Sequence, residues 1–306
     1  MRQDSNYSMD RRTLLGLAAA AAGGALTACS GHPAAHVGAA ATSARQRFKD
    51  KVVLITGATS GIGRAAAMQF AAEGAKVGFC GRRESLGHEV EQEIRSRGGE
   101  AAYIRADVRN ESDVKAFVDQ ITQKYGRLDV AFNNAGITIE KPLHEFSSAE
   151  WDDVLNTNLR GVFLAIKYEV PHMLSTGGGN IVVTSSSTAI ATTEKRSAYT
   201  SSKRGLVGLV QSAAHDYAAK GIRINALIPG TTDTDLVRRA AHMEGVPDEV
   251  WKVAAAQWAK SHVPGLERMA KPEEIAAFAL ALASDDFPYM TAAQMVIDGG
   301  KTAHAG

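Results

Sequence analysis

The chain has 306 residues, of which 45% are hydrophobic, so it can bury the core of one large domain or two small ones. Its 34 basic residues nearly balance 33 acidic residues, and no dense Lys/Arg block occurs. This pattern argues against nucleic-acid binding and against a polybasic membrane surface, which leaves small molecules as the expected ligands. The two cysteines, Cys29 and Cys80, have no C-x-x-C or His-rich surroundings, so we expect neither a disulfide nor a metal site.

Residues 1–29 resemble a bacterial export signal. Arg11 and Arg12 precede an Ala- and Leu-rich stretch, as in twin-arginine signals, and this stretch is short for a membrane span. It ends in Leu-Thr-Ala-Cys at Cys29, which resembles a lipobox whose cleavage would leave Cys29 as a lipidated N-terminus. We therefore expect an exported protein, periplasmic or membrane-anchored through Cys29. The alternative is an uncleaved Ala-rich extension on a cytoplasmic protein.

Residues 30–49 are predicted to form a flexible linker, because Ala, Gly, Ser and Thr dominate there with little apolar periodicity. His32 and His36 lie four residues apart in this stretch, but a disordered linker is a poor metal site.

From residue 50 to residue 306, short apolar runs alternate with longer amphipathic ones, and no repeat or Pro/Ser linker interrupts them. This pattern predicts one α/β domain, a single doubly wound parallel sheet of the Rossmann-like type with helices on both faces. The expected strands are Val52–Ile55, Lys76–Cys80, Ala101–Ile104, Val130–Asn133, Asn180–Thr184, Arg223–Ile228 and Gln294–Ile297.

A glycine-rich turn follows the first expected strand. Gly57, Gly61 and Gly63 let the chain turn sharply into a helix over residues 62–73, which Gly74 closes. Backbone N–H groups and the positive end of that helix can then meet the pyrophosphate of a dinucleotide.

An acid-base pair lies in the second half of the chain. Tyr199 and Lys203 are four residues apart, so on a helix they share one face and the ammonium can stabilise a phenolate. Such a tyrosine can give or take a proton near neutral pH. Ser186 lies 13 positions before Tyr199, although its neighbours Ser185 and Ser187 leave a shift of one residue open.

The order of these motifs resembles that of the short-chain dehydrogenase/reductase family, over about Lys51 to Gly300. The resemblance implies an NAD(P)-dependent oxidoreductase that interconverts a secondary alcohol and a ketone, with a small or moderately apolar substrate. The catalytic residues it implies are Asn158, Ser186, Tyr199 and Lys203. The cofactor-binding residues it implies are Gly57, Ser60, Gly61, Ile62, Gly63, Arg82, Asp107, Val108, Asn134, Ala135, Gly136, Tyr199, Lys203, Pro229, Gly230, Thr232 and Thr234.

The same resemblance assigns roles to the catalytic set. Tyr199 would exchange the proton, and Ser186 would hydrogen-bond the oxygen on which charge develops. Lys203 would hold the nicotinamide ribose and lower the pKa of Tyr199, while Asn158 would position a water. Ala189 and Ala292 depart from the glycines usual at their positions, which affects the expected substrate wall rather than the chemistry.

The end of the second expected strand bears on the choice of cofactor. The stretch Cys80-Gly81-Arg82-Arg83 has no carboxylate for the ribose 2′-hydroxyl of NAD, and Arg82 can bind the 2′-phosphate of NADP. NADP is therefore favoured. NAD is the alternative, because both arginines could instead be solvated, and because Ser60 stands where many NADP-preferring relatives have a basic residue. Cys80 is expected to pack in the core.

Residues 236–266, with Trp251 and Trp258, are expected to form a mobile lid over an apolar substrate, unless the two tryptophans simply face the core.

By resemblance, the helices over residues 150–173 and 198–220 would pair in a homodimer or homotetramer. Two other functions stay open: a dinucleotide-binding sensor without turnover, and an exported structural lipoprotein. Neither needs all four catalytic side chains.

Overall fold

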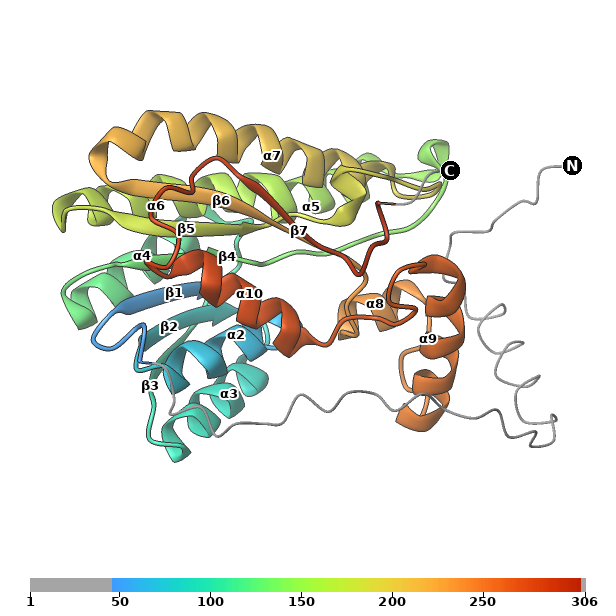
Figure 1. Ribbon diagram of the computed structural model, residues 1–306, viewed down its shortest axis with the longest axis horizontal. Helices are drawn as coiled ribbons and strands as arrows, with labels where there is room; N and C mark the ends of the chain where they lie inside the picture. Colours follow the sequence, from blue (N-terminus) through green and yellow to red (C-terminus); the bar gives the residue numbers. More distant parts are fainter. Residues whose placement is uncertain (1–45, 304–306) are drawn as a thin grey trace, which may run out of the picture.

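The structure is a computed structural model that describes residues 46–303. The expected signal, with Cys29, and most of the expected linker lie outside the described residues. Seven parallel strands form one sheet in the order β3-β2-β1-β4-β5-β6-β7 (Figure 1). The strands are β1 Val52–Thr56, β2 Lys76–Gly81, β3 Glu100–Arg105, β4 Val130–Asn133, β5 Gly179–Thr184, β6 Ile222–Pro229 and β7 Gln294–Ile297.

The predicted doubly wound sheet is confirmed, and each strand lies within one residue of its expected bounds. The central strand β1 shows why the sequence folds this way. Val53 and Ile55 pack into the core on one face of the sheet, whereas Val52 and Leu54 pack into the core on the other. Alternate side chains point to opposite faces, so a strand covered on both sides is apolar throughout.

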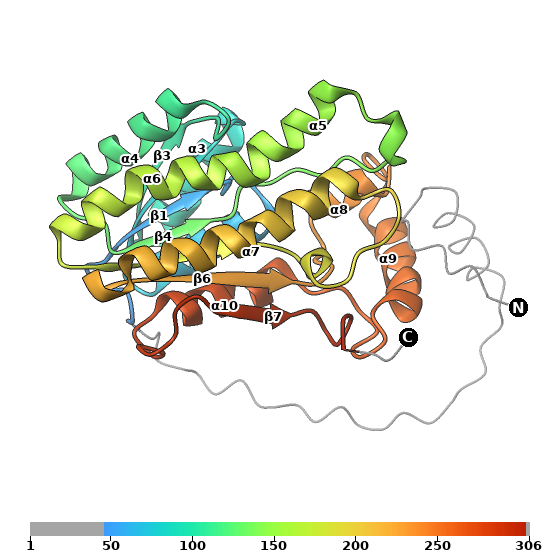
Figure 2. The same ribbon diagram turned by 90° about the horizontal axis from the view of Figure 1, so that it is seen from above.

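Helices cover both faces of the sheet. In Figures 1 and 2, α2, α3 and α10 lie on one face, and α4, α6 and α7 lie on the other. Within residues 46–303, none of the helices combines the length and the apolar character needed to cross a membrane. The helices are α2 Gly61–Ala72, α3 Glu84–Ser96, α4 Glu111–Tyr125, α5 Ser148–Leu155, α6 Gly161–Ser175, α7 Ser197–Tyr217, α8 Asp235–Ala240, α9 Asp248–His262 and α10 Pro272–Ala283.

The segment expected to form a lid folds as α8 and α9, which lie beside the layers of the main domain in Figure 1. It has a small core of its own, in which Met243, Trp251 and Trp258 are buried. The indole N–H of Trp251 donates to Asp233 Oδ1 at 2.7 Å. Trp251 and Trp258 therefore do not pack into the core of the main sheet.

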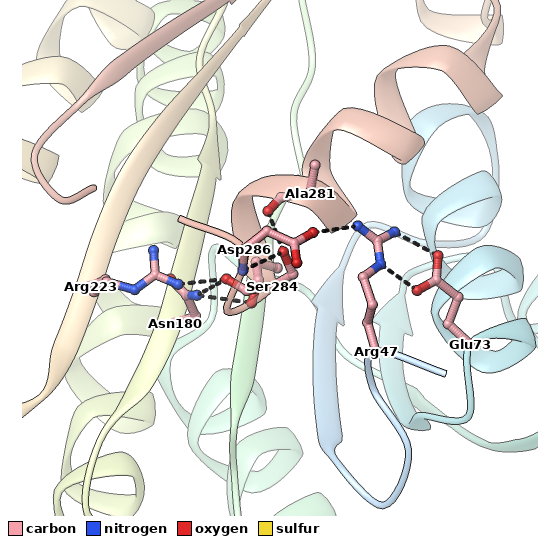
Figure 3. A network of polar contacts seen from close by, with 8 residues as sticks. Arg47, Glu73, Asn180, Arg223, Ala281, Ser284 and Asp286 are labelled. Atoms are coloured by element: carbon pink, nitrogen blue, oxygen red, sulfur yellow. Dashed lines mark hydrogen bonds and ion pairs between the residues drawn. The ribbon is translucent and has the colours of Figure 1, made fainter. Parts of the chain in front are cut away.

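The folded domain begins earlier than the expected linker boundary at residue 49. Phe48 is buried, with its ring edge-on to Phe70 at a centroid distance of 4.8 Å. Arg47 bridges Glu73, at the end of α2, and Asp286, which follows α10, as Figure 3 shows. The linker prediction is wrong for Arg47 and Phe48, because an apolar contact and two ion pairs bind them to the domain.

Candidate active site

A cavity of about 390 Å³ lies at the carboxyl ends of the strands. The chain leaves β1 for β2 on one side and returns from β3 to β4 on the other side of β1, and doubly wound sheets bind ligands at such a point. Gly63 and Asn158 are the two predicted site residues that do not line it. Those that line it are Gly57, Ser60, Gly61, Ile62, Arg82, Asp107, Val108, Asn134, Ala135, Gly136, Ser186, Tyr199, Lys203, Pro229, Gly230, Thr232 and Thr234.

The glycine turn joins β1 to α2. Gly57 has a φ of +71°, and a Cβ built on it would lie 2.6 Å from the Cα of Ala135. A Cβ on Gly63 would lie 2.4 Å from the carbonyl oxygen of Gly57, so Gly63 lets α2 pack closely on the turn. Ser60 precedes α2 without a side-chain capping hydrogen bond, and the first turn holds no acidic residue. These free N–H groups and the positive helix end fit a pyrophosphate.

The segment after β4 is bound to the glycine turn. Thr56 Oγ1 accepts hydrogen bonds from the backbone N–H groups of Asn134, at 3.1 Å, and Ala135, at 3.2 Å. The Asn134 amide donates to the carbonyl of Gly57 at 3.2 Å and accepts from Thr184 Oγ1 at 3.3 Å. Asn134 thus connects β1, β4 and β5 at one edge of the cavity.

Ser186 and Tyr199 both line the cavity wall, where interaction with the Ser186 side chain favours the ionised form of the phenol. The hydroxyl of Ser185 instead donates to the carbonyl of Lys203 at 2.8 Å. Of the three adjacent serines, the structure therefore brings Ser186 to the tyrosine, which is the register that spacing favours.

Burial dominates the electrostatics of the acid-base pair. It raises the pKa of Tyr199, against the hydrogen bond from Ser186 and the charge of Arg196. Burial also lowers the pKa of Lys203 to about 8. Lys203 Nζ donates to the carbonyl of Thr184 at 2.8 Å and lies 5.7 Å from the centre of the Tyr199 ring. The pKa of Tyr199 is therefore raised, because desolvation of the phenol is the largest influence, and the stabilisation of its phenolate by Lys203 stays a prediction.

Asn158 lies behind the cavity wall, fully buried in a π-helical turn, residues 156–160, between α5 and α6. Its Oδ1 accepts from the N–H of Ile137 at 2.8 Å, and its Nδ2 donates to the carbonyl of Ile137 at 2.9 Å and to Ser202 Oγ at 3.1 Å. Turns of this type often occur at functional sites. Asn158 therefore holds the loop after β4 against α7, and its role in placing a water stays a prediction.

The ends of β2 and β3 form another part of the cavity. Burial acts to raise the pKa of Asp107, but hydrogen bonds from Arg109 Nε at 3.0 and 3.1 Å, a hydrogen bond from the Arg109 N–H and the charges of Arg109 and Arg82 together lower it. Arg82 is exposed and lines the cavity. Its neighbour Arg83 donates to the hydroxyl of Ser60 at 2.6 Å and to that of Thr59 at 3.0 Å. The sequence prediction did not assign Arg83 this contact with the glycine turn.

The turn after β6 forms the next part of the cavity wall. The N–H of Gly230 donates to the carbonyl of Ile297 in β7 at 2.9 Å. Thr234 Oγ1 accepts from the N–H of Val237 at 3.4 Å and so caps α8. Cys80, at the end of β2, is buried as expected, and burial raises its pKa to about 12.

The charged cavity residues that the sequence prediction did not assign include Glu140, Arg196 and Lys301, and Trp258 of the expected lid also lines the cavity. Arg196 pairs with Glu140 at 2.6 Å, and Lys301 Nζ lies 5.3 Å from the centre of the Trp258 ring. Arg196 precedes Tyr199 by three residues, so helical spacing could have found it. Glu140 and Lys301 reach the cavity only through tertiary folding. In residues 46–303, no group of three or more His, Cys, Asp or Glu side chains is arranged to hold a metal ion.

The chain belongs to the short-chain dehydrogenase family, whose model matches residues 51–245. It is 38% identical to cyclohexanol dehydrogenase of Acinetobacter sp. (strain SE19), covering 84% of this chain and 97% of the relative. It is also 38% identical to cis-4-hydroxycyclohexanecarboxylate dehydrogenase of Sinomonas cyclohexanicum, covering 84% and 99%. The crystal structure of levodione reductase matches with a TM-score of 0.78 and 37% identity, covering 84% of this chain and all of that chain.

Proposed function

We propose that this protein is an NAD(P)-dependent oxidoreductase that interconverts a secondary alcohol and a ketone, with Tyr199 as the acid-base group. The observation that carries the proposal is the meeting of Ser186, Tyr199 and Lys203 in the same cavity as the glycine turn before α2. Membership of the short-chain dehydrogenase family and the names of its relatives support it.

A bound nicotinamide would supply or accept the hydride. In the reduction direction, the Tyr199 hydroxyl gives its proton to the carbonyl oxygen, and in oxidation the phenolate takes the proton of the alcohol. The Ser186 hydroxyl donates a hydrogen bond to the same oxygen and stabilises the charge that develops there. The nearby Lys203 ammonium stabilises the phenolate, and Asn158 keeps the supporting loop in place.

A screen of ketones with NADPH and NADH tests the activity. Cyclohexanones are the first substrates to try, because two relatives are named for a cyclohexanol and a hydroxycyclohexanecarboxylate. We expect turnover of at least one such ketone. Binding of dinucleotide without turnover of any ketone would favour the sensor function, and failure to bind dinucleotide would favour the structural lipoprotein.

The preferred cofactor is NADP. Arg82 is exposed at the cavity, and Arg83 lies against Ser60, so two guanidinium groups beside the glycine turn are available to bind a 2′-phosphate. We expect Arg82→Ala to weaken NADPH binding by about tenfold or more and to change NADH binding far less. Arg97→Ala, at an exposed arginine that does not line the cavity, is the control. Equal affinity of the unchanged protein for NADPH and NADH would refute the preference.

The protein is exported through its N-terminal segment and anchored through a lipidated Cys29. The support is the Arg11-Arg12 pair and the lipobox-like residues before Cys29. Cell fractionation with a probe for acylated cysteine tests this, and Cys29→Ser should release the protein from membranes. Recovery of the full-length chain in the cytoplasm would contradict it.

The protein also forms a homodimer or homotetramer. The support is the pair of long helices, α6 and α7, through which the family resemblance implies that copies pair. Light scattering that gives the mass of a monomer at micromolar concentration would contradict this assignment.

A further inference from the structure

A lysine with no carboxylate in direct contact, among the described residues, lies in the cavity wall. Lys301 follows β7 and lines the cavity together with Tyr199. Its Nζ donates to the hydroxyl of Thr231 at 3.0 Å and lies over the Trp258 ring, both of which are neutral groups. Within residues 46–303, Lys301 forms no ion pair with a carboxylate.

The nearby carboxylates are engaged elsewhere. Glu140 pairs with Arg196. Asp298 accepts hydrogen bonds from the N–H of Gly300 at 2.9 Å and from the N–H and hydroxyl of Thr302 at 2.9 and 2.6 Å. Burial, and next the charge of Arg196, lower the pKa of Lys301 to about 8, against the smaller effects of the charges of Asp298 and Glu140. The ammonium is thus partly desolvated, with no acidic partner in direct contact, which is unfavourable unless a ligand supplies one.

We propose that Lys301 forms a carboxylate-binding subsite, so that the substrate is an oxo- or hydroxycarboxylate whose reacting oxygen meets Tyr199 and whose carboxylate meets Lys301. This inference rests on the proposed function. The Trp258 ring and the Thr231 hydroxyl hold the ammonium in place, and a carboxylate gains a charge-assisted hydrogen bond there. Arg196 is already paired with Glu140 at 2.6 Å, whereas Lys301 has no such carboxylate partner among the described residues.

Two ketones that differ in one charge test the subsite: 4-oxocyclohexanecarboxylate and its methyl ester, each with NADPH. In the unchanged protein, kcat/KM for the acid should exceed that for the ester by about tenfold or more, the factor that corresponds to ~1.4 kcal/mol. Lys301→Met should reduce this preference by about tenfold or more, mainly through KM. An unchanged preference in Lys301→Met would overturn the proposal.

Lys260→Met is the matched control, because Lys260 is an exposed lysine of α9 that does not line the cavity. It should leave the acid-to-ester preference as it is. NADPH titration of Lys301→Met separates the two anions that could meet the ammonium. If NADPH affinity falls by the same factor as the preference, the charge serves the cofactor and the proposal is overturned.

Calorimetric binding of cyclohexanecarboxylate to the protein–dinucleotide mixture provides a readout that needs no turnover. If no ketone of the screen reacts, the proposed function fails. Binding of cyclohexanecarboxylate that Lys301→Met abolishes would still support the subsite, and absence of binding to the unchanged protein would overturn it.

Discussion

Glu169 should make the stability of the protein fall as the pH rises. This carboxyl group of α6 is fully buried, and Oε2 accepts a single hydrogen bond, from Asn133 Nδ2 at 2.9 Å. Among the described residues, Oε1 has no hydrogen-bond partner. Burial raises the pKa of Glu169 to about 8, from an ordinary value of 4.5. The native protein therefore keeps this proton up to about pH 8.

The sign and size of the effect follow from proton linkage. Between pH 4.5 and about 8 only the unfolded chain ionises at this position, so it binds fewer protons than the native state and stability falls as pH rises. Taking these two pKa values, the loss between pH 5 and pH 8 is about 3 to 4 kcal/mol. Glu169→Gln has nearly the same shape but cannot ionise, so it should lack this component.

Urea unfolding of both proteins at pH 5, 6, 7 and 8 measures the effect. The free energy of unfolding of the unchanged protein should fall relative to that of Glu169→Gln by about 3 to 4 kcal/mol across the series. Parallel curves over the whole range would show that Glu169 is ionised in the native protein, which would refute the reasoning.

Two further substitutions test the turn and the start of the domain. Gly57→Ala should weaken dinucleotide binding by about tenfold or more in a titration, because its Cβ would collide with Ala135. The control Gly98→Ala, at a residue with positive φ but no neighbour within 4 Å, should cost only about 1 to 2 kcal/mol of strain and leave binding intact. Equal binding by both variants would contradict this. Phe48→Ala should lower the free energy of unfolding by about 3 to 5 kcal/mol in urea denaturation, because it empties the site against Phe70, and an unchanged stability would place Phe48 outside the fold.

The sheet was predictable because its signals are local. The apolar run at β1 and the glycines after it fix a strand, a sharp turn and a helix within about twenty residues. The approach of Ser186 to Tyr199 was likewise predictable from their spacing, since a serine just after β5 and a tyrosine in the first turn of α7 both reach the cavity. The approach of Arg83 to Ser60 was not predictable, because it depends on how β2 ends beside the turn after β1.

Long-range contacts explain the other differences. Lys301 reaches the cavity only because β7 pairs with β6, which brings the C-terminal segment beside Thr231. The raised pKa of Tyr199 depends on burial by several elements, whereas helical spacing shows only its neighbour Lys203. Arg47 lies in a polar stretch, so nothing local indicates its ion pairs with Glu73 and Asp286.

Replacement of Tyr199 by Phe tests the central claim most directly, since it removes the phenolic oxygen and keeps the ring. With a ketone that the unchanged protein reduces, kcat/KM should fall by about 10³-fold or more, while the Kd of the dinucleotide stays within about threefold. Turnover by Tyr199→Phe at close to the original rate would show that another group moves the proton, and the assignment of Tyr199 as the acid-base residue would be wrong.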